Sequence, residues 1–253
     1  MIDVHAHFAE EGYSFPDEWN KIQAAGVTRV ILAGDTLEHT RLHRDFCREH
    51  EGAYYTVGIH PESAGAALDS EDFEEFFFLA KDKKCVAVGE IGLDYHYPEF
   101  DKSAQHRLFT TQLKLAKECA LPVQIHSRDA CADTLAILRE YRECLQNGFL
   151  MHCYSYGKEN IDAFLALGAF FSFGGVSCFK NAKKVWESVE ACPADRILSE
   201  TDSPYLSPFR GEKNSPANIP VIVERLAQLK GMGKEELALQ IEKNAEQLFP
   251  RLK

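Results

Sequence analysis

Histidines and carboxylates stand where several apolar segments of this chain end, and together they could bind divalent cations. The residues concerned are His5, His7, Glu90, His126, His152 and Asp202. His5 and His7 are two apart in an extended segment, so both side chains leave the same face and can chelate one ion. A lone strand histidine is more often a core residue, but two in this spacing favour a metal site.

Glu90 lies inside the otherwise apolar segment VGEIGLD, where an unpaired carboxylate would be costly to bury. Its two oxygens could bridge two metal ions, although a salt-bridged glutamate is the alternative. His126 and His152 end successive segments and could share the second ion. Asp202 could complete the first ion's shell and accept a proton from bound water, or simply cap a turn. Histidine and carboxylate ligands without thiolate fit Zn, Mn, Ni or Mg at an open hydrolytic site.

Other polar residues are candidates for substrate contacts. Arg128 and Arg210 could clamp a phosphate through two parallel hydrogen bonds, which lysine does less well. His60, in GIHP, could donate to a phosphate or serve a structural role. His39 and His43 have the helical spacing of a metalloprotease motif, but threonine stands where that motif needs glutamate. We interpret these two histidines as part of a solvent-exposed helix face.

The elements that must position these side chains alternate between short apolar runs and amphipathic stretches, which is typical of parallel strands joined by helices. Eight strands are expected, beginning near residues 2, 28, 53, 85, 122, 149, 169 and 196. Eight such units in a chain of this length predict an α/β fold, a (β/α)₈ TIM barrel. Since all strand ends of a barrel point to one face, the candidate ligands are expected to converge there.

Helices are predicted where apolar residues share one face. These are Phe109, Leu113, Ala116 and Ala120 in one segment, and Ile219, Ile222, Val223 and Leu226 in another. Ser215 followed by Pro216 is a helix start, and residues 234–253 predict a last helix that ends near Pro250. Because no linker or low-complexity tract interrupts this order, residues 1–253 are interpreted as a single barrel domain.

The composition excludes several classes of protein. The chain has 253 residues, 45% of them hydrophobic, and a net charge of 28 − 39 = −11, so a broad basic surface for nucleic acid is excluded. The eight scattered cysteines form no C-x-x-C pair, which favours buried thiols in a reducing compartment over a zinc or redox site. Without a membrane-length apolar run or a signal-like start, we expect a cytoplasmic protein with no membrane partner. A monomer is expected, and an oligomer is the alternative.

Seven ordered motifs, DVHAH, GIHPE, VGEIGLDYH, PVQIHSRDA, MHCYS, SETDSPYLSP and RGEKNSP, resemble those of the TatD family of metal-dependent hydrolases. The resemblance extends from residue 1 to NAEQLF near the C-terminus. It implies two divalent cations, held by His5, His7, Glu90 and Asp202 on one side and by Glu90, His126 and His152 on the other. It also implies a deoxyribonuclease or related phosphodiesterase, with DNA or a short nucleic acid bound locally at the metal site. The candidate substrate-binding residues are His60, Arg128, Tyr154 and Arg210.

Two departures from the family pattern lie in loops that we expect to contact substrate. Tyr156 occupies a position where the family usually has glycine, and the loop from Arg210 to Pro216 is shorter than usual. The resemblance therefore implies the ligand set more directly than it implies the substrate.

The resulting hypothesis is hydrolysis with two metal ions, in which Glu90 bridges the ions and Asp202 takes the proton of the attacking water. Shallow, local binding by an acidic chain favours cleavage at strand ends or of single strands, in the manner of a 3'-5' exonuclease. One alternative is hydrolysis of an ester or amide, such as an aminoacyl-tRNA ester, because fold does not decide substrate. The other alternative is a barrel without catalysis.

Overall fold

The computed structural model describes residues 1–7, 9–10, 13–65 and 73–253. Eight parallel strands form one sheet in the order β1-β4-β5-β6-β7-β8-β9-β10, so strand order around the sheet follows the chain. Their bounds are Ile2–Ala6, Arg29–Leu32, Ala53–Val57, Cys85–Asp94, Val123–Arg128, Phe149–Met151, Ala169–Phe173 and Ile197–Ser199. The predicted TIM barrel and all eight predicted strands are confirmed. A short antiparallel pair, β2 (Ala9–Glu10) with β3 (Tyr13–Ser14), was not foreseen.

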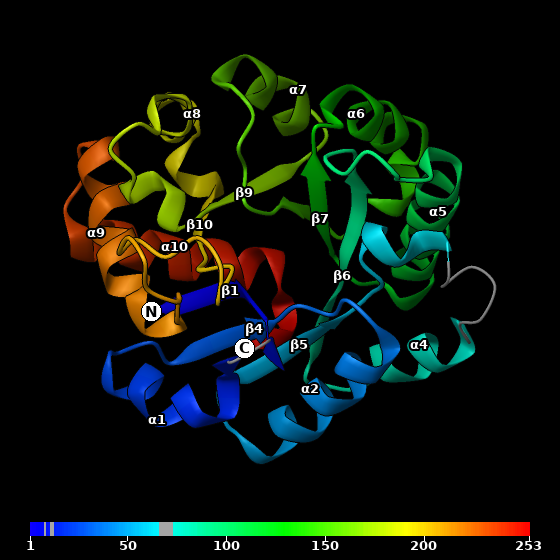
Figure 1. Cartoon of the computed structure of the whole chain (residues 1–253), viewed down its shortest axis with the longest axis horizontal. Helices are drawn as coiled ribbons and strands as arrows, with labels where there is room; N and C mark the ends of the chain where they lie inside the picture. The colour runs from blue at the N-terminus through cyan, green and yellow to red at the C-terminus, as the bar shows by residue number, and fades with distance from the viewer. Residues whose placement is uncertain (8, 11–12, 66–72) are drawn as a thin grey trace.

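Helices form an outer ring around these strands (Figure 1). They are α1 Phe15–Ala24, α2 Leu37–Glu49, α4 Phe73–Ala80, α5 Lys102–Cys119, α6 Cys131–Glu140, α7 Ile161–Leu165, α8 Lys183–Ala191, α9 Ile219–Lys230 and α10 Lys234–Leu248. The core between helices and strands is apolar, and the strand residues of β1, β6 and β9 are buried throughout. Among the described helices, none has both the length and the apolar character that crossing a bilayer would require.

The predicted helix details are mostly confirmed. Ser215 accepts a hydrogen bond from the Ala217 amide and caps a 3-10 turn that leads into α9, and α10 ends at Leu248. The prediction for Ala120 was wrong: this residue is exposed and lies just beyond α5, with a left-handed backbone at φ +53°. Helix α5 ends there because the chain must turn back at once into β7.

The interpretation of His39 and His43 as a solvent-exposed pair was also wrong for His43, which is 1% exposed. His43 lies on the inner face of α2, against the strands. Burial, reinforced by the neighbouring charge of His39, lowers the pKa of His43 to about 3. His39 remains partly exposed, and its Nδ1 lies 2.8 Å from Asp35 Oδ1.

The barrel closes where β1 meets the segment that follows β10. The amide of His7 donates to the Ser203 carbonyl at 2.9 Å, and the amide of Asp202 donates to the His5 carbonyl at 3.0 Å. The buried carboxylate of Asp3 accepts from the amides of His5 and Thr201. These hydrogen bonds tie the first candidate ligands to the last one in the sequence.

Close packing of β6 against β7 fixes a second pair of candidate ligands. Gly92 has φ +149°, and a Cβ built there would lie 1.9 Å from the His126 carbonyl oxygen. A side chain at residue 92 would push the two strands apart. Glycine therefore allows residue 92 to pair directly with His126, which brings His126 close to Glu90, two residues earlier in β6.

Candidate metal centre

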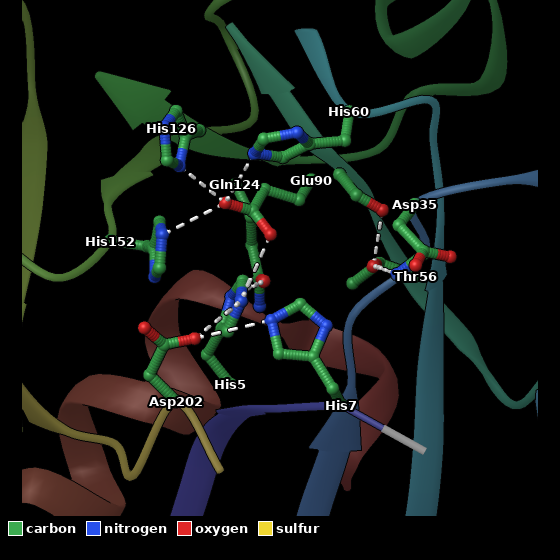
Figure 2. Close-up of polar contacts among 12 residues, drawn as sticks. His5, His7, Asp35, Thr56, His60, Glu90, Gln124, His126, His152 and Asp202 are labelled. Atoms are coloured by element: carbon green, nitrogen blue, oxygen red, sulfur yellow. Dashed lines mark hydrogen bonds and ion pairs between the residues drawn. The ribbon is translucent and has the colours of Figure 1, made fainter. Parts of the chain in front are cut away.

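The six side chains singled out in the sequence converge at the carboxyl ends of the strands (Figure 2). The side chains form three overlapping groups, and within each group the ligand atoms lie within 4.8 Å of one another. They are His5, His7 and Asp202; His5, Glu90 and His152; and His60, Glu90 and His126. The sequence prediction that these residues meet at one end of the barrel is confirmed, although they are separated by up to 197 positions in the chain.

The ring of His5 is oriented from within the barrel. Its Nδ1 lies 3.0 Å from Gln124 Oε1, while Gln124 donates its amide to the Val4 carbonyl at 2.8 Å. Because a glutamine oxygen only accepts hydrogen bonds, the proton of a neutral His5 ring belongs on Nδ1. Its Nε2 is then a lone-pair donor, directed at Glu90 and Asp202 at 3.2 and 3.8 Å.

Glu90 occupies the middle of the group. Its Oε1 lies 2.6 Å from His126 Nδ1 and 2.9 Å from His152 Nε2, whereas Oε2 faces His5. Although burial favours the neutral acid, the charge of the nearby His152 ring and the hydrogen bond from His126 hold the pKa of Glu90 well below its usual range. The carboxylate is therefore ionised and presents one oxygen to each side of the site.

Two carboxylates that the sequence analysis did not single out lie behind the histidines of the second group. Asp94 Oδ2 is 2.9 Å from His126 Nε2, and Glu200 Oε2 is 3.4 Å from His152 Nδ1. Glu200 is fully buried and accepts a hydrogen bond from the Ser172 hydroxyl. Carboxylates in this position orient histidine ligands and make them more basic. A signal was available for Asp94, since alternation along β6 places it on the same face as Glu90.

Several buried polar atoms of the site have no hydrogen-bond partner among the described residues, including His5 Nε2 and Glu90 Oε2. These two atoms face each other, one a lone pair and the other an anion. Leaving such groups unpaired is costly, and a cation between them would satisfy both. The donor set therefore fits divalent cations bound through nitrogen and oxygen.

His7 and Asp202 are partly exposed and lie close together in the site. Their Nε2 and Oδ1 atoms are 3.2 Å apart. Burial disfavours the charged ring of His7, but its hydrogen bond to Asp202 and the charge of that carboxylate outweigh burial and raise the pKa of His7 to about 9. Burial also opposes charge on Asp202, yet the hydrogen bond from His7 lowers the pKa of Asp202. Cation binding at His7 would therefore release a proton.

The site opens into a cavity of about 600 Å³, which both His60 and Arg128 line. His60 Nδ1 accepts a hydrogen bond from the Glu62 amide, and burial lowers the pKa of His60 to about 3. A neutral ring that accepts at Nδ1 carries its proton on Nε2, which lies 3.7 Å from Glu90 Oε1. His60 can therefore donate a hydrogen bond at the cavity wall.

The other two candidates for substrate binding do not reach this cavity. Tyr154 is 3% exposed, packs its ring against Phe171 and donates its hydroxyl to the Gly157 carbonyl. The prediction that Tyr154 binds substrate was wrong. The left-handed backbone of Cys153, at φ +44°, turns the chain so that Tyr154 points into the core. Arg210 is exposed and lies outside the residues that line the cavity.

Tyr156, the residue that replaces the usual glycine, joins two loops at the edge of the site. Its hydroxyl lies 2.8 Å from Ser127 Oγ and accepts from the Ala130 amide. This departure therefore fixes the loop after β7 to the loop after β8. It reinforces the position of the segment that carries Arg128.

Comparisons with known proteins identify the family of this chain. Residues 2–250 match the family described as TatD related DNase. The chain is 36% identical over 253 residues to a Bacillus subtilis protein named "Uncharacterized metal-dependent hydrolase YabD", and the alignment covers 98% of each chain. It is 34% identical over 236 residues to a Cronobacter sakazakii protein named "3'-5' ssDNA/RNA exonuclease TatD", covering 90% of this chain and 89% of that one.

A solved structure leads to the same family. The Escherichia coli TatD homologue YJJV superposes with a TM-score of 0.88 at 27% identity, covering 99% of this chain and 98% of that chain. The resemblance seen in the sequence motifs is therefore confirmed. This chain belongs to the TatD related DNase family of metal-dependent hydrolases.

Proposed function

We propose that this protein is a phosphodiesterase that uses two divalent cations to cleave DNA from a strand end, in the manner of a 3'-5' exonuclease. The observation that carries the proposal is Glu90, whose two carboxylate oxygens face different groups of histidines. His5, His7, Glu90 and Asp202 would hold one cation. Glu90, His126 and His152 would hold the other.

The side chains have separate tasks in this reaction. Bound divalent cations supply charge neutralisation at the phosphate and a nucleophilic water at neutral pH. Asp202 is ionised and lies at the accessible edge of the site, so it is the residue to accept the proton of the attacking water. His60 Nε2–H and the guanidinium of Arg128 face the cavity and would hold the phosphate oxygens.

Two observations support nucleic acid as the substrate. Relatives of this chain from Cronobacter sakazakii and Klebsiella pneumoniae are named as 3'-5' ssDNA/RNA exonucleases. The net charge of −11 favours a substrate held at one point over a duplex bound along its length. A strand end needs only such a local site.

The test uses the full chain with single-stranded DNA labelled at its 5' or 3' end and added Mn²⁺ or Mg²⁺. We expect stepwise shortening from the 3' end, which EDTA abolishes. Asp202→Asn should lower kcat by about 10²- to 10⁴-fold, the usual contribution of a positioned general base. Cleavage that persists in EDTA would contradict the proposal. Hydrolysis of aminoacyl-tRNA or lactones with no cleavage of DNA would assign the site to an ester or amide instead.

A further inference from the structure

The walls of the cavity are poorly suited to holding phosphates by charge. Five carboxylates from or just beyond four strands line it, at Asp35, Glu62, Glu90, Asp94 and Asp202. Within the described part of the chain, Arg128 is the single arginine or lysine that lines it. Phosphates beyond the one at the metal site would meet few cations there. A nucleic acid strand therefore needs another kind of contact on either side of the reacting group.

Two tyrosines at the mouth of the same cavity offer that contact. Tyr97 is 51% exposed and Tyr205 is 47% exposed, although the large aromatic side chains of this protein are otherwise mainly buried or partly buried. Both line the cavity. Tyr97 follows β6 and Tyr205 follows β10, the fourth and eighth strands around the barrel. The two rings therefore stand on opposite sides of the mouth, with the metal-binding side chains between them.

The loop that carries Tyr205 is held rigidly. The Tyr205 amide donates to the Asp202 carbonyl, and the Asn214 amide donates to the Pro204 carbonyl, both at 2.9 Å. Gly175 allows the Leu206 carbonyl to approach the neighbouring loop, since a Cβ there would lie 2.0 Å from that oxygen. The Tyr205 ring also meets His7 edge-on, with centroids 5.6 Å apart. Tyr205 is thereby fixed in place beside the proposed ligands.

Tyr97 is placed by charged and aromatic neighbours. The Arg128 guanidinium carbon lies 5.7 Å from the centre of its ring, and His96 meets the ring edge-on at 5.2 Å. His96 in turn lies 3.2 Å from Asp129, the residue after Arg128. An exposed ring beside a guanidinium is the arrangement on which single-stranded bases stack.

We propose that Tyr97 and Tyr205 are stacking platforms for the two bases that flank the scissile phosphate. This inference rests on the proposed function and specifies how the strand is selected. Stacking accepts any base, because every base has a flat aromatic face, but it requires bases that are unpaired. The two platforms would therefore favour single strands and frayed ends with little preference for sequence.

The experiment combines protein variants with substrate variants. Tyr97→Ala and Tyr205→Ala are compared with the full-length wild-type chain in Mn²⁺ on a hexanucleotide and on hexanucleotides carrying one abasic residue at successive positions. On the intact strand, each substitution should raise KM by about tenfold or more, as expected for loss of one stacked base, with kcat changed far less. The corresponding Tyr→Phe variants should retain the wild-type KM. Phe78→Ala, which removes an exposed aromatic ring on α4, is the matched control.

Abasic substrates distinguish stacking from a structural role. If Tyr97 stacks on one base, wild type and Tyr97→Ala should have the same KM on the strand that lacks that base. Tyr205→Ala should match the wild-type KM on a strand whose abasic residue is at a different position. The proposal would be overturned if a variant raised KM by the same factor on the intact strand and on every abasic strand. So would both variants mapping to the same base. A second readout is the dependence of KM on salt. Log KM should rise only shallowly with log salt concentration, with a slope of about +1, because few phosphates are neutralised.

A binding measurement separates this inference from the proposed nuclease activity. With 2-aminopurine in place of the flanking base, stacking on tyrosine should quench its fluorescence, and the alanine variant should restore the signal. Quenching by a protein that cleaves no DNA would refute the nuclease function and support the platforms. Cleavage without quenching at any position would refute the platforms and leave the nuclease function intact.

Discussion

Replacing Glu90 by glutamine is the sharpest perturbation of the metal site. Glutamine has nearly the same shape, but it loses the negative charge and one of the two oxygens that face the imidazoles of His5, His126 and His152. If Glu90 bridges two cations, one substitution weakens both. We expect loss of the stabilisation that Mn²⁺ gives to the protein, loss of bound metal and loss of phosphodiester cleavage.

The size of the effect follows from ligand linkage. At a free ion concentration 100 times Kd, binding adds about 2.7 kcal/mol to the free energy of unfolding for each ion. A 100-fold weaker Kd, the upper range for losing only an outer partner of a ligand, reduces this to about 0.4 kcal/mol. For two independent ions the loss is about 4.6 kcal/mol, or roughly 9–18 °C in the Mn²⁺-dependent rise of Tm for a chain of this size.

The assay is thermal unfolding during Mn²⁺ titration, together with elemental analysis of the dialysed protein. Glu62→Gln makes the same chemical change in the same cavity and serves as control, because Glu62 belongs to none of the three ligand groups. The control should keep the wild-type rise in Tm. The reasoning would be refuted if Glu90→Gln kept two bound ions, or if it lost only one of them.

Three further substitutions test particular contacts. Glu200 lies behind His152, and Glu200→Gln should weaken Mn²⁺ binding by about 10- to 100-fold at unchanged stoichiometry, as measured by calorimetry. A variant that binds Mn²⁺ with wild-type affinity would exclude an orienting role for Glu200. His43 has a folded pKa near 3 against 6.5 unfolded, so the unfolded state binds more protons between these values and stability falls as pH drops through this window. His43→Leu should remove up to about 4–5 kcal/mol of that dependence, seen as a flatter plot of unfolding free energy against pH, whereas an unchanged slope would contradict it. Ala120→Gly should raise the free energy of unfolding by about 1 kcal/mol in urea melts, since alanine is strained at φ +53°, and a destabilised variant would refute this.

The sequence was sufficient to predict the barrel and the meeting of the candidate ligands, because both depend on regular geometry. Parallel strands in sequence order place all their carboxyl ends on one face, so any polar residue at a strand end is directed to a common site. Alternation along a strand then selects the side: His5 and His7 share a face, and so do Glu90 and Asp94. Asp94 could have been found by the same rule.

The predictions that were wrong or missing concern residues whose positions the regular strand geometry does not determine. Past the strand, Cys153 has a left-handed backbone, so alternation no longer tells which side Tyr154 faces. Burial of His43 depends on how α2 lies against β5, which helical spacing alone does not specify. Glu200 is hidden for a different reason. It comes two residues before Asp202, in a segment whose hydrogen bonds to β1 are made only when the barrel closes.

The charges of the site link the binding of cations to the binding of nucleic acid. The carboxylates of Glu90, Asp202 and Asp94 that would attract cations also repel a phosphate in the same cavity. Bound cations would reverse the sign of the local field, so cations and a polyanionic substrate should each tighten the binding of the other by the same factor. A chain with net charge −11 can then act on nucleic acid without a basic surface. Its affinity for the strand would reside at the metal centre and at the tyrosines beside it, the two places where negative charge on the protein does not oppose binding.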